Sequence, residues 1–442
     1  MLYLIGVLVM VIGIGASIGL HEVGHLVPAK RFGVRVPQYM VGFGPTLWST
    51  RRGETEYGIK AIPLGGYVRM IGMFKPNATG EPSARRGRMA QMVEDARAQS
   101  AEEIEPGDDG RVFYGLSVPK KITIMLGGPM TNIVIALVLF TGIFTLYGVA
   151  EASTTVRTVS QCVDTNVSAT GTAATECTPQ MPKAPAAEAG FLPGDTITAV
   201  NGEPVRTWDQ IREDIRVSGD QPMTFTIERQ DETRTLEATP MMMDRPRYSE
   251  TGRPLVDDAG KPLTERVGFL GAAPTQVLVK QPITAVPGMF ADMVGTTVTF
   301  IGQIPSKLVG VGEAAFGSAE RDVEGPMSVV GVGRVAGEVA SSSQAGSSMD
   351  RFVLLISLIA GLNLVLGILN LIPLLPLDGG HVAGAIWEGI KKGWARLRGL
   401  PDPGPVDTAK ALPLAYTVAL AFIAMTVLLV YADIVKPVRL TG

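Results

Sequence analysis

Residues 2–29 read LYLIGVLVMVIGIGASIGLHEVGHLVPA, and this stretch decides the kind of protein to expect. Its first part, residues 2–20, is uncharged and has about the 20 residues that a helix needs to cross roughly 30 Å of hydrocarbon. A signal peptide is the alternative, but the stretch lacks a basic beginning and ends in ionisable residues. We therefore predict a transmembrane helix at residues 1–29.

Three later stretches have the same apolar character, and they predict spans at residues 120–150, 351–389 and 411–434. The whole chain is 46% hydrophobic and only 18% charged, whereas soluble domains carry about a quarter charged residues. We therefore predict a polytopic α-helical membrane protein with four transmembrane helices in a lipid bilayer. The net charge of -3 gives no reason to expect a nucleic-acid partner.

The charges between these stretches predict the orientation, because Lys and Arg concentrate on the cytoplasmic side of a membrane. Lysines and arginines follow the first span, precede the second and occur throughout the loop at residues 390–410. They are Lys30, Arg31 and Arg35 after the first span, Lys120 and Lys121 before the second, and Lys391, Lys392, Arg396, Arg398 and Lys410 in the loop. Both termini and the long loop at residues 151–351 are then periplasmic. Lys436 and Arg439 oppose this assignment for the extreme C-terminus.

The two cysteines of the chain, Cys162 and Cys177, both fall in that outer loop. An oxidising periplasm would allow them to form a disulfide. The alternative is a pair of unlinked small apolar residues.

The first chemical signal is His21-Glu22-Val23-Gly24-His25. On a helix the two histidines are four residues apart and lie on one face, so both imidazoles can reach one metal ion. Glu22 is then placed to take a proton from an attacking water. The alternative is a set of polar residues capping the inner end of the span, although ionisable groups at membrane depth usually mark a functional site.

A catalytic zinc ion needs a third protein ligand, and the end of the third span offers two. Residues 370–381 read NLIPLLPLDGGH, so Asp378 and His381 are both candidates. Pro373 and Pro376 would break the helix there, and broken backbone at that depth is tolerated only inside protein or beside a cavity. The alternative is an aspartate that merely caps the next helix, with Gly-Gly as a turn.

The two motifs together resemble the site-2 protease family of intramembrane metalloproteases, in particular its regulator-of-sigma-E protease (RseP-type) branch. The resemblance implies that His21, His25 and Asp378 bind one Zn²⁺ per chain and that Glu22 is the general base. It leaves the role of His381 open.

Other motifs resemble the same branch in the same order. Residues 42–45 and 55–68 look like its membrane-associated β-hairpin, within a cytoplasmic segment at residues 30–119 that also carries a flexible insert. Gly128-Pro-Met-Thr-Asn132 looks like its GPxxN element, and Gly325-Pro326 lies in a segment similar to the one before its third span.

The family implies that the hairpin edge, with Gly65 and Gly66 in its turn, receives an unwound substrate strand by β-addition. It also links Asn370 and Asn132 to substrate handling. The alternative is that both amides join helices within the membrane.

The outer loop contains Ala189-Gly-Phe-Leu-Pro-Gly-Asp195, followed by an Asn-Gly turn, a helix and a hairpin. This order looks like one periplasmic PDZ-like α/β domain at residues 151–273, with an insertion at residues 160–182 that carries both cysteines. Many members of the branch have two such domains in tandem. Residues 274–350 are predicted to form helices at the outer membrane interface.

These features predict an intramembrane zinc metalloprotease of a bacterial inner membrane. The resemblance implies site-2 cleavage of single-span membrane proteins, such as anti-sigma factors or remnant signal peptides, after an upstream periplasmic protease has made the first cut. Water would reach the site from the cytoplasmic end, between the first and third spans. A zinc transporter or sensor is one alternative, but a binding site has no need of a base such as Glu22. A catalytically inactive PDZ scaffold is the other, but it would have no need of the intact zinc motif.

Overall fold

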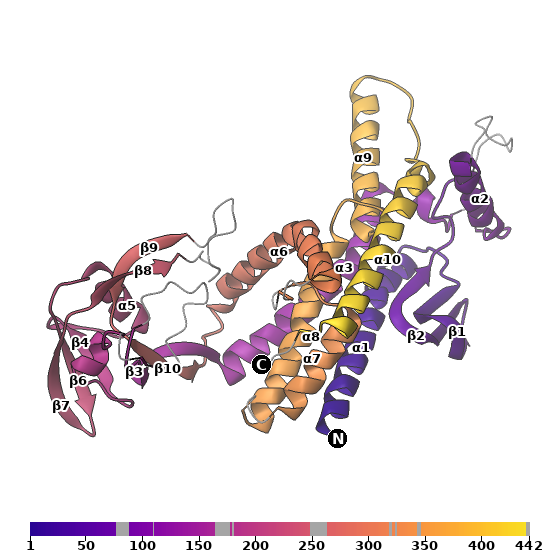
Figure 1. Cartoon of the computed structure of the whole chain (residues 1–442). Helices are drawn as coiled ribbons and strands as arrows, with labels where there is room; N and C mark the ends of the chain where they lie inside the picture. The colour runs from indigo at the N-terminus through magenta and orange to yellow at the C-terminus, as the bar shows by residue number, and fades with distance from the viewer. Residues whose placement is uncertain are drawn as a thin grey trace. The chain divides into compact units, whose positions relative to one another are not determined.

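The computed structural model describes residues 1–76, 88–108, 110–163, 177–178, 181–247, 263–317, 321–322, 325–342 and 346–438. The predicted cytoplasmic insert and the cysteine-bearing insertion lie partly outside these residues. The chain divides into two compact units (Figure 1). Unit 1 comprises residues Met1–Ile143 and Ile283–Gly442, and unit 2 comprises Phe144–Pro282.

Within the described residues, four helices of unit 1 are long and apolar enough to cross a membrane, and they fall at the four predicted spans. These are α1 (Leu2–Arg31), α3 (Val118–Gly142), α8 (Ser348–Asn370) and α10 (Leu412–Val435). The other helices of this unit are α2 (Arg88–Glu102), α6 (Val286–Phe316), α7 (Val329–Ser341) and α9 (Asp378–Leu397), with short 3₁₀ turns η1 (Phe113–Gly115) and η3 (Thr408–Ala411). The chain is therefore a multi-pass membrane protein.

Small residues let α1 pack closely against its neighbours. A Cβ on Gly6 would overlap the backbone of Ala336 in α7, and a Cβ on Gly13 would fall 2.5 Å from Ile359 Cδ1 in α8. Where α1 meets α3, Gly24 and Gly127 face each other with no room for a side chain on either. Close backbone approach of this kind is how helices associate in lipid, where burial of apolar surface gives no driving force.

The third apolar stretch is not one continuous helix. Helix α8 ends at Asn370, and α9 begins at Asp378 after a loop that contains Pro373 and Pro376. Proline has no backbone N–H to continue a helix, so the break follows from the sequence. Cβ atoms on Gly379 and Gly380 would collide with the backbone of this loop, so the Gly-Gly pair allows the loop to fold tightly against the first turn of α9.

Strands β1 (Gln38–Arg52) and β2 (Thr55–Arg69) form a separate two-stranded antiparallel sheet. Its register is irregular, because residues 38–41 are paired both with residues 56–59 and with residues 66–69. The hairpin is therefore longer than the predicted one, and it includes residues 38–41. Its turn lies at Gly53 and Glu54. The predicted turn at Gly65 and Gly66 is wrong, because both residues lie inside β2. Phe43, Leu47 and Trp48 are exposed on β1, as apolar side chains of a membrane-associated hairpin would be.

Unit 2 is built on a six-stranded sheet with the strand order β10-β3-β4-β6-β7 and with β5 paired to β4. Its elements are the π-helical turn η2 (Ile143–Tyr147), β3 (Val149–Val159), α4 (Pro185–Glu188), β4 (Thr196–Val200), β5 (Glu203–Pro204), α5 (Trp208–Val217), β6 (Met223–Arg229), β7 (Glu232–Ala238), β8 (Met241–Pro246), β9 (Thr264–Phe269) and β10 (Ala272–Val279). Strands β8 and β9 form a second, two-stranded sheet. The core of the unit includes Phe191, Ile211 and Phe225.

Two features of unit 2 depend on residues far apart in the sequence. Strand β10 pairs with β3, so the unit extends to Pro282 and the predicted boundary at residue 273 falls inside a strand. Cys162 and Cys177 are joined by a disulfide.

Candidate metal centre

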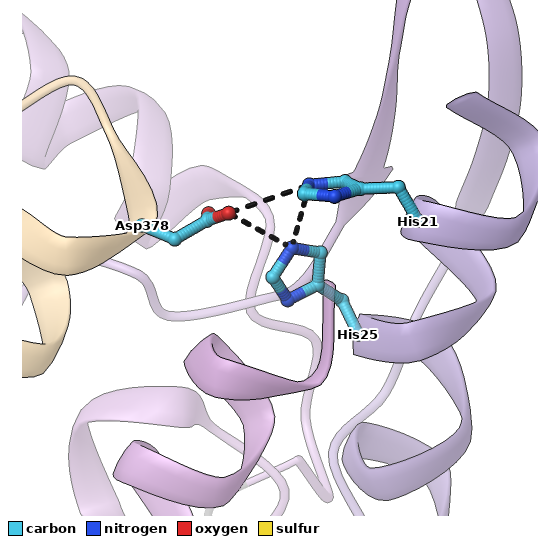
Figure 2. Close-up of side chains that lie close together, drawn as sticks. All are labelled: His21, His25 and Asp378. Atoms are coloured by element: carbon cyan, nitrogen blue, oxygen red, sulfur yellow. Dashed lines mark hydrogen bonds and ion pairs between the residues drawn. The ribbon is translucent and has the colours of Figure 1, made fainter. Parts of the chain in front are cut away.

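Three side chains from two distant parts of unit 1 converge on one point. His21 and His25 extend from the same face of α1, and Asp378 is the first residue of α9 (Figure 2). The Nε2 atoms of the two histidines are 3.3 Å apart, and the Asp378 Oδ2 atom lies 3.3 Å from each of them. Among the described residues this is the one group of histidines, cysteines and acidic residues arranged to hold a metal ion.

The spacing of these three atoms is that of ligands around zinc. Ligands about 2.0–2.1 Å from a tetrahedral zinc ion lie roughly 3.3–3.4 Å from one another. All three measured separations agree with this value. Two imidazoles and one carboxylate are also a ligand set that catalytic zinc sites use, with the fourth position left to water. The residues present therefore fit a zinc ion.

A hydrogen bond to α3 orients His25 for metal binding. Its Nδ1 atom lies 2.8 Å from the carbonyl oxygen of Ile124, which can only accept, so Nδ1 carries the proton. In the neutral ring Nε2 then has a free lone pair, and this is the atom that faces His21 and Asp378. Nδ1 of His21 is buried and has no hydrogen-bond partner among the described residues.

Gly128, also on α3, makes room for the ligands. A Cβ at this position would overlap Nε2 of His25 and would fall 2.7 Å from Nε2 of His21. The glycine of the GPxxN element is thus required by the metal centre itself. The two histidines can approach α3 only because residues 127 and 128 have no side chains.

Glu22 is buried beside the hairpin. Its carboxylate lies near the backbone N–H of Val68 in β2. A Cβ on Gly66 would fall 2.9 Å from Glu22 Cγ, and a Cβ on Gly65, whose φ is +120°, would fall 2.5 Å from the Phe43 ring. Gly66 therefore allows β2 to pass close to Glu22, whereas Gly65 makes room for the Phe43 ring of β1.

His381 lies outside the ligand group and lines a small cavity together with Lys121 and Glu388. Of the two candidates for the third ligand, the structure brings Asp378 to the histidines. Leu377, and not Asp378, occupies the N-cap position of α9, so the capping alternative does not account for Asp378.

An ion-pair cluster holds α9 against α3 near this cavity. Glu388 Oε2 accepts hydrogen bonds from Lys121 Nζ at 2.7 Å and from the backbone N–H of Val406 at 3.2 Å, while Oε1 accepts one from Lys392 Nζ at 2.7 Å. Burial alone would raise the pKa of Glu388, but the hydrogen bonds from the two lysines outweigh it and hold the pKa below its ordinary value. From the sequence, Lys121 and Lys392 were predicted only to contribute to the positive charge of the cytoplasmic loops.

Three asparagines lie in or at the ends of the spans, and they differ in their contacts. Asn363 Nδ2 donates to Ser17 Oγ and to the Ile359 carbonyl oxygen, both at 2.8 Å, so this residue joins α8 to α1. Asn363 was not among the predicted site residues, although an amide within an apolar span is a signal for such a contact. The predicted Asn132 is buried with its Oδ1 atom unpartnered among the described residues, and Asn370 is half-buried at the end of α8.

Asp195, in the turn before β4 of unit 2, is the buried acidic residue of the Ala-Gly-Phe motif. It accepts hydrogen bonds from Arg229 and from the N–H of Leu192. Burial alone would raise its pKa, but these hydrogen bonds lower it below the ordinary value. A cavity of about 290 Å³ lies elsewhere in this unit, between α5 and the end of β9.

Comparison with known proteins assigns the family. Residues 9–398 match Peptidase family M50, and the chain belongs to this family. It is similar to "Zinc metalloprotease Rip1" of Mycolicibacterium smegmatis, with 34% identity over the full length of both chains, and to the protein of the same name in Mycobacterium tuberculosis strain H37Rv, with 33% identity over the full length of both. It is also similar to "Metalloprotease MmpA" of Caulobacter vibrioides, with 29% identity over 88% of this chain and 89% of the relative.

The chain is therefore a membrane zinc metalloprotease of family M50. This assignment decides for the protease over the transporter, sensor and inactive-scaffold hypotheses. It agrees with the predicted site-2 protease family, and the finer assignment to one branch stays a prediction.

Proposed function

We propose that this enzyme is a regulator-of-sigma-E type site-2 protease that cleaves single-span membrane proteins with Glu22 as its general base. The convergence of His21, His25 and Asp378, with 3.3 Å between the donor atoms and Glu22 in the next position of α1, carries this proposal. Zinc, when bound, polarises the scissile carbonyl and lowers the pKa of its water ligand toward about 7. Glu22 accepts the proton of the attacking water and passes it to the leaving amine.

The substrate strand would lie along the hairpin. A helical peptide hides its carbonyl groups, so the bond must be extended before water can attack it. The stretch of β2 around Gly66 and Val68 runs beside Glu22, and an extended strand that adds to this sheet would pass the base. Asn132 and Asn370 are proposed to hold the unwound segment, and the buried Oδ1 atom of Asn132 has no hydrogen-bond partner among the described residues.

The proposed topology places the termini in the periplasm and the metal centre toward the cytoplasm of a bacterial inner membrane. Lys30 and Arg31 lie in the last turn of α1, and Lys120 lies over the ring of Phe32 just after it. The basic ends of α1 and α3 are thus at one end of unit 1, as the excess of Lys and Arg in cytoplasmic loops requires.

Unit 2 is proposed to be a periplasmic PDZ-like domain that admits only substrates already shortened by an upstream protease. Its order of α4, two strands, α5 and a hairpin, with Asp195 closing the turn before β4, supports this assignment. Anti-sigma factors and remnant signal peptides are the substrate types that the branch implies.

The test is cleavage of a shortened single-span reporter by the purified full-length protein in detergent. Glu22→Gln should retain one zinc per chain but lose roughly 10²–10⁴-fold in rate, the usual contribution of a general base. Glu232→Gln, an exposed residue of unit 2, is the matched control and should cut like the wild type. A chelator should stop the wild type, and added zinc should restore it. Cleavage by Glu22→Gln at the wild-type rate would remove Glu22 from the mechanism.

A further inference from the structure

Helix α9 carries an exposed apolar face that none of the functions above explains. It is not one of the four span helices. The exposed fractions of its outward side chains range from 48% for Ile386 to 84% for Leu397, and Trp387, Ile390 and Trp394 are each 56% exposed. With 100° between successive residues, these five positions fall on one face of the helix. The opposite face, with Glu388 and Ala395, is buried.

Two cationic side chains, Lys391 and Arg398, flank this face, and a third, Arg396, lies farther round the helix near its end. All three are exposed, and none forms a salt bridge within the part of the chain that the structure describes. The guanidinium carbon of Arg398 lies 4.3 Å from the centre of the Trp394 ring. Tryptophan, aliphatic and cationic side chains exposed close together are typical of a protein surface at a membrane–water boundary.

The packing of α9 places this face at the end of the spans. A Cβ on Gly389 would fall 3.3 Å from Val118 Cγ1, and Val118 is the first residue of α3. Residue 389 is therefore level with the end of a span. Ile386 and Trp387 precede this level, while Trp394 and the cations follow it toward the aqueous side. Aromatic rings at the boundary and cations beyond it are the order that a bilayer surface selects.

We propose that α9 crosses the bilayer surface and that its exposed face binds anionic phospholipid headgroups there. Ile386, Trp387 and Ile390 lie against the upper acyl chains, and Trp394 lies at the level of the headgroups. Lys391, Arg396 and Arg398 pair with the headgroups. This charge pattern favours a lipid surface over a protein partner, because the cations stand beside the apolar residues at the level where headgroups lie. This lipid site does not depend on the proposed protease mechanism, because it requires only that the spans cross a bilayer.

The experiment uses the full-length protein in nanodiscs of phosphatidylcholine with increasing fractions of phosphatidylglycerol, one of the two lipids carrying bromine near the top of its acyl chains. Bromine quenches nearby tryptophan fluorescence, and the double variant Trp387→Phe/Trp394→Phe identifies the signal from α9. Brominated phosphatidylglycerol should quench this signal more strongly than brominated phosphatidylcholine at equal bromine content. The variant Lys391→Gln/Arg396→Gln/Arg398→Gln should lose the preference, by up to about a hundredfold, because each cation near an anionic surface contributes about fivefold.

A matched control removes the same charge from unit 2, as Arg206→Gln/Arg212→Gln/Arg234→Gln, and should keep the lipid preference. Equal quenching by the two lipids in the wild type would overturn the proposal. Quenching of the α9 signal by acrylamide in water, with none by either brominated lipid, would also overturn it and would indicate a docking face for a protein.

Discussion

Replacing Glu388 by glutamine removes the negative charge from a carboxylate that three donors surround. The side chain of Glu388 is 2% exposed and that of Lys121 is 5% exposed, so the variant leaves the Lys121 ammonium buried without a counter-ion. Breaking a buried pair in this way costs about 3–5 kcal/mol. Lys392 is 29% exposed and can turn to water, so its share of the loss is small. We expect the local stability that holds α9 against α3 to fall by about 3–5 kcal/mol, which corresponds to a roughly 10²- to 10³-fold or larger rise in local opening.

Hydrogen exchange of the full-length protein in detergent measures this opening directly. Backbone amides at residues 385–397 should exchange faster in Glu388→Gln by the same factor. Glu54→Gln, which breaks the half-exposed pair with Arg111 in the same unit, is the control. It should change the free energy of local opening by less than about 1 kcal/mol. The double variant Lys121→Met/Glu388→Met should recover most of the protection, because apolar residues of similar volume replace a buried ion pair at little cost.

The pH dependence supplies a second readout of the same carboxylate. The pKa of Glu388 is lowered in the folded state, so its contribution to stability is complete above the ordinary glutamate pKa of about 4.3 and is lost as the pH falls through the folded value. In the wild type, the protection of α9 amides against hydrogen exchange should therefore decline as the pH falls below that value. In Glu388→Gln, this protection should not show the same dependence on pH. The reasoning would be refuted if Glu388→Gln lowered the free energy of local opening of α9 by less than about 1 kcal/mol at neutral pH. It would also be refuted if Glu388→Gln and Glu54→Gln lowered this free energy equally.

Three further predictions address other contacts. Gly128→Ala should abolish stoichiometric zinc binding, measured by elemental analysis, because its methyl group would occupy the position of the His25 Nε2 atom; Gly142→Ala on the same helix has open space and is the control. Asn363→Leu should weaken the contact of α8 with α1 by about 1–2 kcal/mol in thermal unfolding, and Ser17→Ala combined with it should add little, since both remove one hydrogen bond; additive losses would mean that the two act separately. Asp195→Asn should destabilise unit 2 by about 1–3 kcal/mol, because it removes the charge that accepts hydrogen bonds from the partly exposed Arg229, and hydrogen exchange in β4 and β6 should increase; unchanged exchange would contradict the contribution of this pair.

The membrane spans and half of the metal centre could be predicted from local sequence. An uncharged stretch of about 20 residues predicts a span whatever surrounds it, because no other element satisfies the backbone in lipid. His21 and His25 are four residues apart on one helix, so the period of the helix alone brings them together. The break after Asn370 is also local, since two prolines cannot continue a helix.

Tertiary structure decided the rest. Asp378 and His381 begin the same helix three residues apart, and the sequence left either as the third ligand; the packing of α9 on α3, held by Lys121 and Glu388, turns Asp378 toward the histidines. The need for glycine at position 128, the register of the hairpin and the extension of unit 2 through β10 likewise depend on partners far along the chain. Local periodicity determines which face of an element is apolar or carries ligands, but only packing determines which other element that face meets.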